Sequence, residues 1–227
     1  VLGFVTAFVP QEMIDLAKFG GINYHPSLLP KYRGGSAINW AIINGETETG
    51  VTIHFIDDGV DTGPILLQEK VAITPDDTVK SVYFNKLYPL GIEMIAKAVK
   101  QIREGRANPI TQDESSASFQ PVITAADTLI DWTQPTQQVY NLVRGSNPSP
   151  GALTSFSGQQ LKIFDAARTP ETGKPGTVLA VGDEGFSVAT ADGAIKILSV
   201  QPAGSKKLPA LEFCKATGLK TGDPLGS

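Results

Sequence analysis

Asn23 and His25 end a short run, INYH, which predicts a β-strand. Because residues two apart on a strand point to the same face, these two side chains share one side. The carboxyl ends of strands in an open α/β sheet face the crevice where ligands bind, and a polar pair suits a buried apolar face poorly. The pair indicates either a reaction centre or a core histidine that bonds a carbonyl through one ring nitrogen.

The acidic segment DDGVDTG at 57–63 is the second candidate for chemistry. It lacks the ligand spacing and the distal glutamate of an EF-hand, so a calcium site is not predicted. A carboxylate from this segment, held beside His25, would orient the imidazole and raise its pKa. The histidine would then be a better proton donor.

Three further residues have side chains that could take part in chemistry. Arg33, in the loop SLLPKYRGG, is either an anion or substrate contact or a surface charge. His54 lies within VTIHF, where we predict packing or a local hydrogen bond. Cys214 lies on a helical apolar pattern and is predicted to be buried and inert. Nucleotide-binding and serine-hydrolase motifs of the forms GxxxxGK[ST], GxGxxG and GxSxG do not occur.

The composition is that of an ordinary globular protein, with 227 residues, 41% of them hydrophobic, and a formal net charge of −4. This charge argues against nucleic-acid binding by bulk electrostatics alone. The lysines near the end of the chain indicate a small basic patch or a solvated helix face, and they are Lys206, Lys207, Lys215 and Lys220. Two histidines and one cysteine predict neither a zinc site nor a disulfide framework. Without a signal peptide or a long apolar run, the expected location is the cytoplasm, with no membrane partner.

The elements that must position these residues alternate between strand and helix in the first half of the chain. The patterns predict helices over 10–20, 36–45 and 74–105, the last kinked or divided by Pro89, and strands over 1–9, 22–25, 50–57 and 64–73. This alternation indicates an α/β layer with a partly parallel sheet. Residues 107–118 are polar, lack periodicity and predict a linker.

The second half of the chain has a different texture. A helix predicted within 135–145 precedes short strands at 152–156, 159–166, 176–181, 185–190 and 194–200, and a helix over 209–218 closes the chain. This is the pattern of a small antiparallel barrel. The predicted organisation is therefore a domain over 1–106, a linker over 107–118 and a barrel domain over 119–227.

The runs INYHPSLLPKYRGGSAINW and GVTIHFIDDGVDTG together resemble the formyltransferases that use 10-formyltetrahydrofolate. The resemblance continues through PDDTVKSVY, IDW, VRGSNPSPGA and ILSVQPAG, where the chain is similar to the C-terminal barrel of the methionyl-tRNA formyltransferases. It implies a Rossmann-like catalytic domain followed by an OB-like barrel. It also implies that the first strands and helices of the catalytic domain are absent from this sequence.

The resemblance also assigns roles to residues of this chain. It implies that Asn23 and His25 stabilise the formyl oxygen as it becomes an oxyanion, and that Asp61 holds His25 and helps to move a proton. The implied co-substrate is 10-formyltetrahydrofolate, and the residues expected to border it are Thr6, Ala7, Phe8, Val9, Asp57, Asp58, Gly59 and Val60. Substrate contacts are expected from Ser27, Leu28, Leu29 and Arg33. No metal is expected, and the resemblance leaves the oligomeric state open.

The formyl acceptor is left open among three chemistries. The barrel segments favour the amino group of methionyl-tRNA, which would make tRNA a partner and place the protein in protein biosynthesis. Water is the alternative, as in the hydrolase domain of 10-formyltetrahydrofolate dehydrogenase, although that domain has an apolar residue at the place of Asn23. The third acceptor is a nucleotide-linked amino sugar. The non-catalytic alternative is a module that binds folate or RNA without carrying out a reaction.

Overall fold

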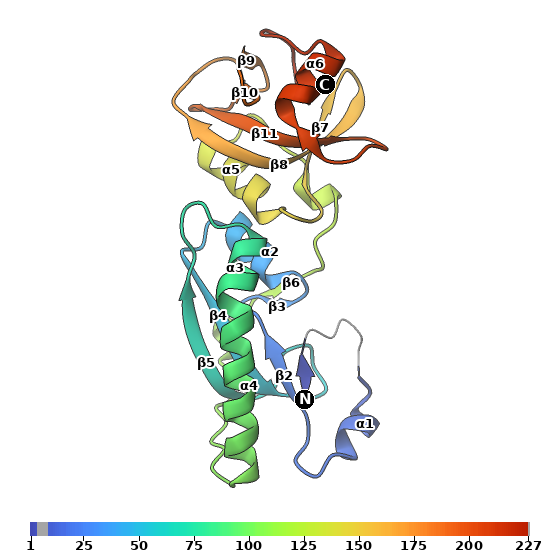
Figure 1. Ribbon diagram of the computed structural model, residues 1–227. Helices are drawn as coiled ribbons and strands as arrows, with labels where there is room; N and C mark the ends of the chain where they lie inside the picture. The colour runs from blue at the N-terminus through green and yellow to red at the C-terminus, as the bar shows by residue number, and fades with distance from the viewer. Residues whose placement is uncertain (4–8, 227) are drawn as a thin grey trace. The chain divides into compact units, whose positions relative to one another are not determined.

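The computed structural model describes residues 1–3 and 9–226, which form two compact units. The first unit comprises residues 1–41 and 46–122, and the second comprises residues 42–45 and 123–227. In Figure 1 the blue and green parts of the chain trace most of the first unit, and the yellow to red parts trace most of the second.

A mixed sheet with the order β1-β2-β4-β5 forms the centre of the first unit. Its strands are β1 (Leu2–Gly3), β2 (Ile22–His25), β4 (Glu48–Phe55) and β5 (Ile65–Ala72). β1 runs parallel to β2, and the other neighbours are antiparallel. The predicted α/β layer with a partly parallel sheet is confirmed. Residues 4–8 of the strand predicted over 1–9 lie outside the described residues.

The helices of the first unit follow the predicted order with different bounds. They are α1 (Gln11–Asp15), α2 (Ala37–Ile43), α3 (Val79–Val82), a π-helix η1 (Tyr83–Leu87) and α4 (Tyr88–Arg103). The division predicted at Pro89 lies just before it, where η1 separates α3 from α4. Pro89 has no N–H to donate, so it is accommodated in the first turn of α4.

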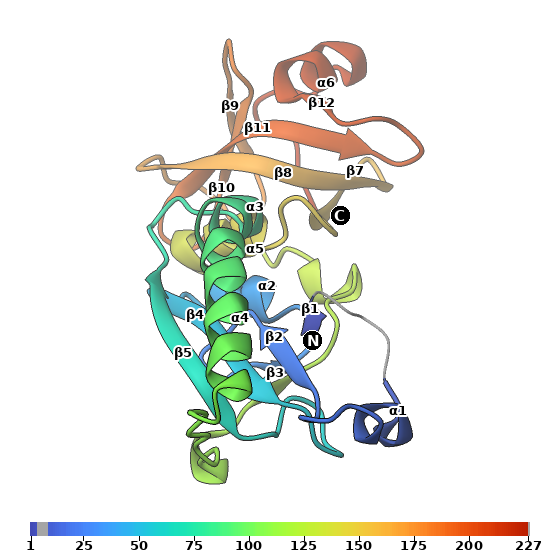
Figure 2. The same cartoon turned by 60° about the horizontal axis from the view of Figure 1, so that its bottom comes forward.

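α4 packs against the sheet through a glycine and a tyrosine, and Figure 2 shows the helix lying along the strands. A Cβ built on Gly91 would lie 2.3 Å from the Tyr24 ring, so only glycine permits this approach. The Tyr24 hydroxyl donates to the carbonyl oxygen of Leu87 at 3.4 Å. Because side chains alternate along β2, the helix takes Tyr24 while Asn23 and His25 point to the other face.

The segment predicted as a linker packs within the first unit. It carries a short 3-10 helix, η2 (Glu114–Ser116), and leads into β6 (Phe119–Gln120). β6 pairs in parallel with β3 (Arg33–Gly34), so two short strands join parts of the chain more than 80 residues apart. Residues 107–118 therefore help to build the unit that contains Asn23 and His25.

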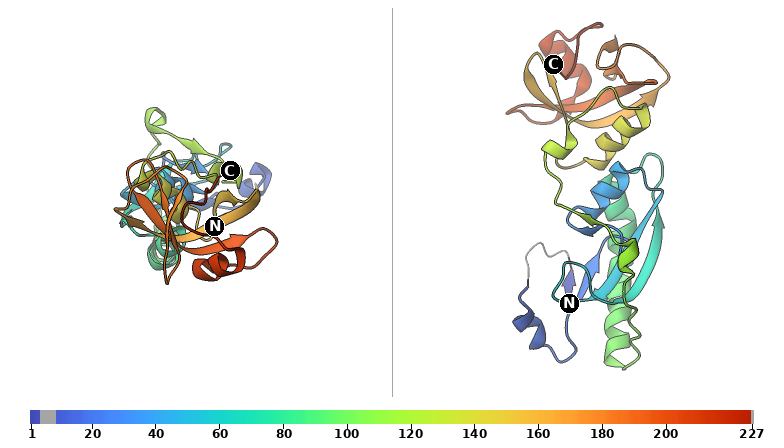
Figure 3. Two further views of the ribbon diagram at one scale, coloured as in Figure 1. Left: turned by 90° about the horizontal axis from the view of Figure 1, so that it is seen from above. Right: turned by 180° about the vertical axis from the view of Figure 1, so that it is seen from behind.

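A six-stranded antiparallel sheet forms the second unit, and its strands can be followed in Figure 3. They are β7 (Ala152–Phe156), β8 (Gln159–Thr169), β9 (Val178–Val181), β10 (Phe186–Ala189), β11 (Ala194–Pro202) and β12 (Leu208–Pro209). The order is β7-β8-β11-β10-β9, with β12 on β11. The described strands show no pairing of β7 with β9 that would close the sheet, so the OB-like barrel stays a prediction.

Helices and an apolar core complete the second unit. They are η3 (Ala126–Thr128), α5 (Thr136–Gly145) and α6 (Ala210–Thr217). The core gathers residues from both α5 and α6 around fully buried sheet residues such as Ile163, Phe186 and Ile195. In the part of the chain that the structure describes, no helix is long and apolar enough to cross a membrane.

Candidate active site

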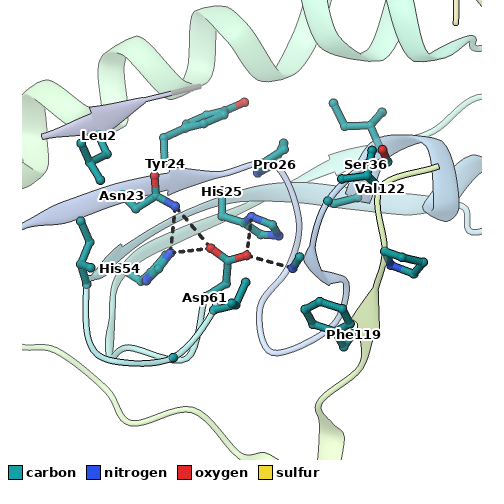
Figure 4. Close-up of a pocket in the computed structure, with 18 of the residues that line it drawn as sticks. Leu2, Asn23, Tyr24, His25, Pro26, Ser36, His54, Asp61, Phe119 and Val122 are labelled. Carbon is teal, nitrogen blue, oxygen red and sulfur yellow. Dashed lines mark hydrogen bonds and ion pairs between the residues drawn. The ribbon is translucent and has the colours of Figure 1, made fainter. Parts of the chain in front are cut away.

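The carboxylate of Asp61 is the centre of a polar cluster on the face of the sheet opposite α4 (Figure 4). Its Oδ2 accepts the N–H of Gly34 at 2.9 Å and lies 3.4 Å from Nδ1 of His25. Its Oδ1 accepts from Nδ2 of Asn23 at 3.3 Å and lies 3.4 Å from Nε2 of His54. The three residues predicted as a reaction centre, Asn23, His25 and Asp61, are thus brought together, and His54 joins them.

The pairing of β2 with β4 explains why His54 is there. Asn23 lies directly opposite His54 in the antiparallel register, and His25 lies opposite Thr52. Directly opposed residues point to the same face of a sheet, with Cβ atoms about 5 Å apart. His54 was predicted to pack or to form a local hydrogen bond. Its Nδ1 does bond the carbonyl oxygen of Phe55 at 2.8 Å, but its Nε2 faces the cluster.

His25 is 4% exposed, and its ring is held by the backbone carbonyl group of Tyr32. Its Nε2 lies 2.7 Å from the carbonyl oxygen of Tyr32, which can only accept, so Nε2 carries the hydrogen. Nδ1 is then the ring atom that faces Asp61. Burial lowers the pKa of His25 below 6.5 and outweighs the opposing effects of Asp61 and of the Tyr32 carbonyl. Asp61 does act to raise this pKa, as expected, but the net shift is downward because desolvation disfavours the charged ring more than one carboxylate at 3.4 Å favours it.

Asp61 stays ionised in this cluster. Burial acts to raise its pKa, but the combined effects of His54, His25 and the N–H of Gly34 lower it from 3.8 to about 2. A carboxylate that accepts several hydrogen bonds is stabilised in its charged form. The site therefore combines an ionised Asp61 with a His25 that resists protonation.

The backbone of Asp61 is held by Gln112, a residue that the sequence patterns did not predict to be part of the site. Asp61 has a φ of 56°, which is unusual for a non-glycine residue. Nε2 of Gln112 donates to the carbonyl oxygens of Asp61 and Gly63, each at 2.8 Å. Oε1 of Gln112 accepts from Nη2 and Nε of Arg33, at 2.8 and 3.1 Å. Arg33 also forms an ion pair with Glu114 at 2.6 Å.

The environment of Arg33 therefore differs from both alternatives that were predicted for it, a substrate contact and a surface charge. It is neither a surface charge nor a side chain of the cavity, because it is 6% exposed and its guanidinium is bound by Gln112 and Glu114. Together, Arg33 and Gln112 form a clamp that links the loop after β2 to the segment 107–118 and to the Asp61 turn. We call this pair the Arg33–Gln112 clamp.

The cluster opens into a cavity of about 640 Å³. Asn23, His25, His54 and Asp61 line one side of it, and Phe119 and Val122 line another (Figure 4). Among the residues predicted to border the folate, Val9, Asp57, Gly59 and Val60 line the cavity, whereas Asp58 does not. Thr6, Ala7 and Phe8 lie outside the described residues. The size suits a drug-sized ligand with an apolar ring system.

The other predicted substrate contacts, Ser27, Leu28 and Leu29, are not among the residues that line the cavity. Ser27 is 1% exposed and donates to the carbonyl oxygen of Lys31 at 2.7 Å. Leu29 is buried, and its N–H donates to Oγ1 of Thr52. Leu28 packs over Gly50, where a Cβ would lie 2.4 Å from its side chain. These residues shape the loop after β2 and hold it on β4.

Cys214 is buried on α6, and burial raises the pKa of its thiol, as expected for an inert cysteine. The described residues contain no group of three or more His, Cys, Asp or Glu side chains that could hold a metal ion.

Both halves of the chain match one family of enzymes. Residues 1–99 match the formyl transferase family, and residues 122–218 match the C-terminal domain of formyl transferases. The chain belongs to the formyl transferase family. The predicted family resemblance is confirmed.

The relatives of the chain include proteins named methionyl-tRNA formyltransferase. The chain is 42% identical to the methionyl-tRNA formyltransferase of Geobacter sulfurreducens over 96% of its own length and 68% of that protein. The relative from Pelotomaculum thermopropionicum, which carries the same name, is 41% identical over 96% of this chain and 70% of that protein. The chain thus spans about two-thirds of the length of these relatives.

Two solved structures share the fold. HypX from Aquifex aeolicus, in complex with tetrahydrofolic acid, has a TM-score of 0.79 and 28% identity over 96% of this chain and 39% of its own. An N-formyltransferase from Helicobacter canadensis, in complex with folinic acid and dTDP-3-aminofucose, has a TM-score of 0.64 and 28% identity over 80% of this chain and 65% of its own. Both of these structures hold a folate.

Proposed function

We propose that the protein transfers the formyl group of 10-formyltetrahydrofolate to the amino group of methionyl-tRNA, in the cytoplasm. The observation that carries this proposal is the cluster of Asn23, His25 and Asp61 at the wall of a cavity in a formyl transferase fold. The identity of about 40% to proteins named methionyl-tRNA formyltransferase supports the choice of acceptor.

The reaction makes two demands on the protein. The acceptor amine attacks the formyl carbon, so the formyl oxygen carries negative charge until the bond to the folate nitrogen breaks. The amine must also lose a proton, while the leaving nitrogen gains one. A site for this chemistry needs a hydrogen-bond donor for the oxygen and a group that can hold a proton in transit.

Asn23 supplies the donor in this proposal. Its amide nitrogen lies on the side of Asp61, at 3.3 Å from Oδ1, a long hydrogen bond that an incoming oxyanion can replace. His25 faces the same space through Nδ1. An oxyanion between the two side chains would meet an amide N–H and an imidazole that becomes a donor once it is protonated.

The pair of His25 and Asp61 supplies the proton relay. A neutral His25 with its hydrogen on Nε2 has a lone pair on Nδ1, which accepts the proton of the attacking amine. The ionised carboxylate of Asp61, 3.4 Å away, stabilises the imidazolium that forms. The same proton then passes to the folate nitrogen as the carbon–nitrogen bond breaks.

The cavity fits the co-substrate, and the second unit is proposed to serve the acceptor. Val9, Asp57, Gly59 and Val60 line the part of the cavity that we assign to the pterin ring of the folate. The second unit, which matches the C-terminal domain of formyl transferases, would meet the tRNA as an OB-like barrel. Lys206 and Lys207 line a hollow of about 570 Å³ on that unit, which agrees with a polyanionic partner.

The test is an assay of tetrahydrofolate release with three acceptors: charged initiator tRNA, a dTDP-linked amino sugar, or water alone. We expect release that requires methionyl-tRNA. Release that is equal without any added acceptor would identify a hydrolase instead. A requirement for the sugar would move the protein to the group represented by the Helicobacter canadensis enzyme. Binding of folinic acid without release in any arm would indicate a silent module.

A further inference from the structure

His54 contacts the candidate active site, yet the roles of Asn23, His25 and Asp61 leave it without a function. It is 2% exposed and lies opposite Asn23 in the register of β2 and β4. Its Nε2 is 3.3 Å from Nδ2 of Asn23 and 3.4 Å from Oδ1 of Asp61. A buried imidazole between an amide and a carboxylate requires a definite arrangement of hydrogens, because each polar atom must find a partner.

The local hydrogen bond of His54 decides which ring nitrogen carries the hydrogen. Nδ1 lies 2.8 Å from the carbonyl oxygen of Phe55, which only accepts, so Nδ1 is the donor. In the neutral ring Nε2 is then a bare acceptor, and it could donate to Oδ1 of Asp61, 3.4 Å away, only if the ring carried a second hydrogen. The neighbour that can donate to it is the amide nitrogen of Asn23 (Figure 4).

We propose that His54 is a positioning residue, which fixes the orientation of the Asn23 amide through Nε2. One N–H of Asn23 is directed to His54, and the other is directed to Asp61. If the amide were turned over, its oxygen would face both the carboxylate of Asp61 and the lone pair of His54. His54 therefore keeps the nitrogen of Asn23, rather than its oxygen, on the side of His25.

This orientation matters for the reaction, so the inference rests on the proposed function. A formyl oxygen that gains negative charge must meet an N–H and not a carbonyl oxygen. An amide with no fixed orientation spends part of its time with the wrong atom forward, which lowers the fraction of productive complexes. The loss of orientation matters when negative charge develops on the formyl oxygen, which happens in the transition state. It should therefore lower kcat and leave the KM for the folate unchanged.

Two variants separate this role from the packing or local bonding that the sequence predicts. In His54→Asn the side-chain amide reaches the position of Nδ1, so it can keep the bond to Phe55 but cannot reach Asn23. In His54→Gln the side-chain amide reaches the position of Nε2, so it can accept from Asn23. A purely local role would be kept by the asparagine and lost by the glutamine, and a positioning role would behave in the opposite way.

The kinetic experiment measures kcat and KM for 10-formyltetrahydrofolate in the wild type and in both variants. We expect His54→Asn to lower kcat about tenfold, with KM unchanged within about twofold, as for the loss of one orienting hydrogen bond. We expect His54→Gln to recover most of that loss. In an Asn23→Ala background the His54→Asn change should have almost no further effect, because its target is gone. A His54→Asn variant with the kcat of the wild type would overturn the proposal. So would a loss of kcat on His54→Asn that is equally large with and without Asn23.

A spectroscopic experiment reads the same feature without catalysis. The chain has only two histidines, so the ring nitrogens can be assigned in a long-range ¹H–¹⁵N spectrum recorded in mildly alkaline buffer. We expect opposite tautomers, with the hydrogen on Nε2 in His25 and on Nδ1 in His54. A His54 ring with its hydrogen on Nε2 would overturn the positioning role. If the acceptor proves to be water or a sugar, the proposed function fails, while the tautomer and the ratios between variants still test His54.

Discussion

Replacement of Gln112 by alanine should damage both the stability and the activity of the first unit. Gln112 is 6% exposed and makes four hydrogen bonds, two to the carbonyl oxygens of Asp61 and Gly63 and two from Arg33. The alanine leaves two carbonyl oxygens and Nε of Arg33 without these partners. Each buried polar group left unbonded costs about 1 to 3 kcal/mol, but water can enter the space of the lost side chain. We therefore expect a loss of about 3 kcal/mol in the free energy of unfolding, taking the lower end for each group.

Thermal melting and formyl transfer measured on the same preparation test this expectation. At about 3 °C per kcal/mol for a protein of this size, the melting temperature of Gln112→Ala should fall by about 10 °C. Activity at a temperature where the variant is still folded should also fall, because Asp61 loses the bond that holds its backbone at a φ of 56°. Glu114→Gln is the control, since the Glu114 side chain is 70% exposed and the glutamine keeps an oxygen that can accept from Arg33, so its melting should stay closer to wild type. A Gln112→Ala protein with wild-type melting and activity would refute the clamp.

The remaining predictions concern three single residues. Asn23→Ala should lower kcat about 10²- to 10³-fold with normal melting, as for a lost oxyanion donor, and wild-type turnover would remove Asn23 from the mechanism. The acid-side midpoint of kcat/KM for the folate should lie below pH 6.5, because burial lowers the pKa of His25 and the neutral ring is the proposed base; a midpoint above 6.5 in the profile of kcat/KM against pH would contradict this. Cys214 should react with iodoacetamide only after unfolding, since it is 4% exposed and its thiol pKa is raised. Rapid labelling of the native protein, followed by mass spectrometry, would show the opposite.

Local patterns in the sequence predicted most of the longer helices and strands and the shared face of two residues of the candidate site. The alternation of side chains along INYH predicted that Asn23 and His25 share a face, and both contact Asp61 in the structure. The partnership of His54 was not predictable in this way, because it depends on which residue of β4 lies opposite Asn23. That register is set by tertiary pairing, and no local signal within VTIHF marks it.

Two other features were missed for different physical reasons. Gln112 lies in a polar segment without periodicity, which is also what a solvated linker looks like, so its burial became visible only with the fold. The lowered pKa of His25 reflects a balance between desolvation and charge. The residue types predict whether each contribution raises or lowers the pKa, but only the depth of burial decides which contribution is larger.

The Arg33–Gln112 clamp has a consequence for anyone who recombines the two halves of this protein. A chimera joined near residue 106, at the end of α4, would contain Asn23, His25 and Asp61 but would import a foreign segment at the position of Gln112 and β6. A join after residue 122 would keep the clamp and the pairing of β3 with β6. The exchangeable module therefore begins after residue 122 rather than directly after α4, and domain-swap libraries for this fold should place their crossover there.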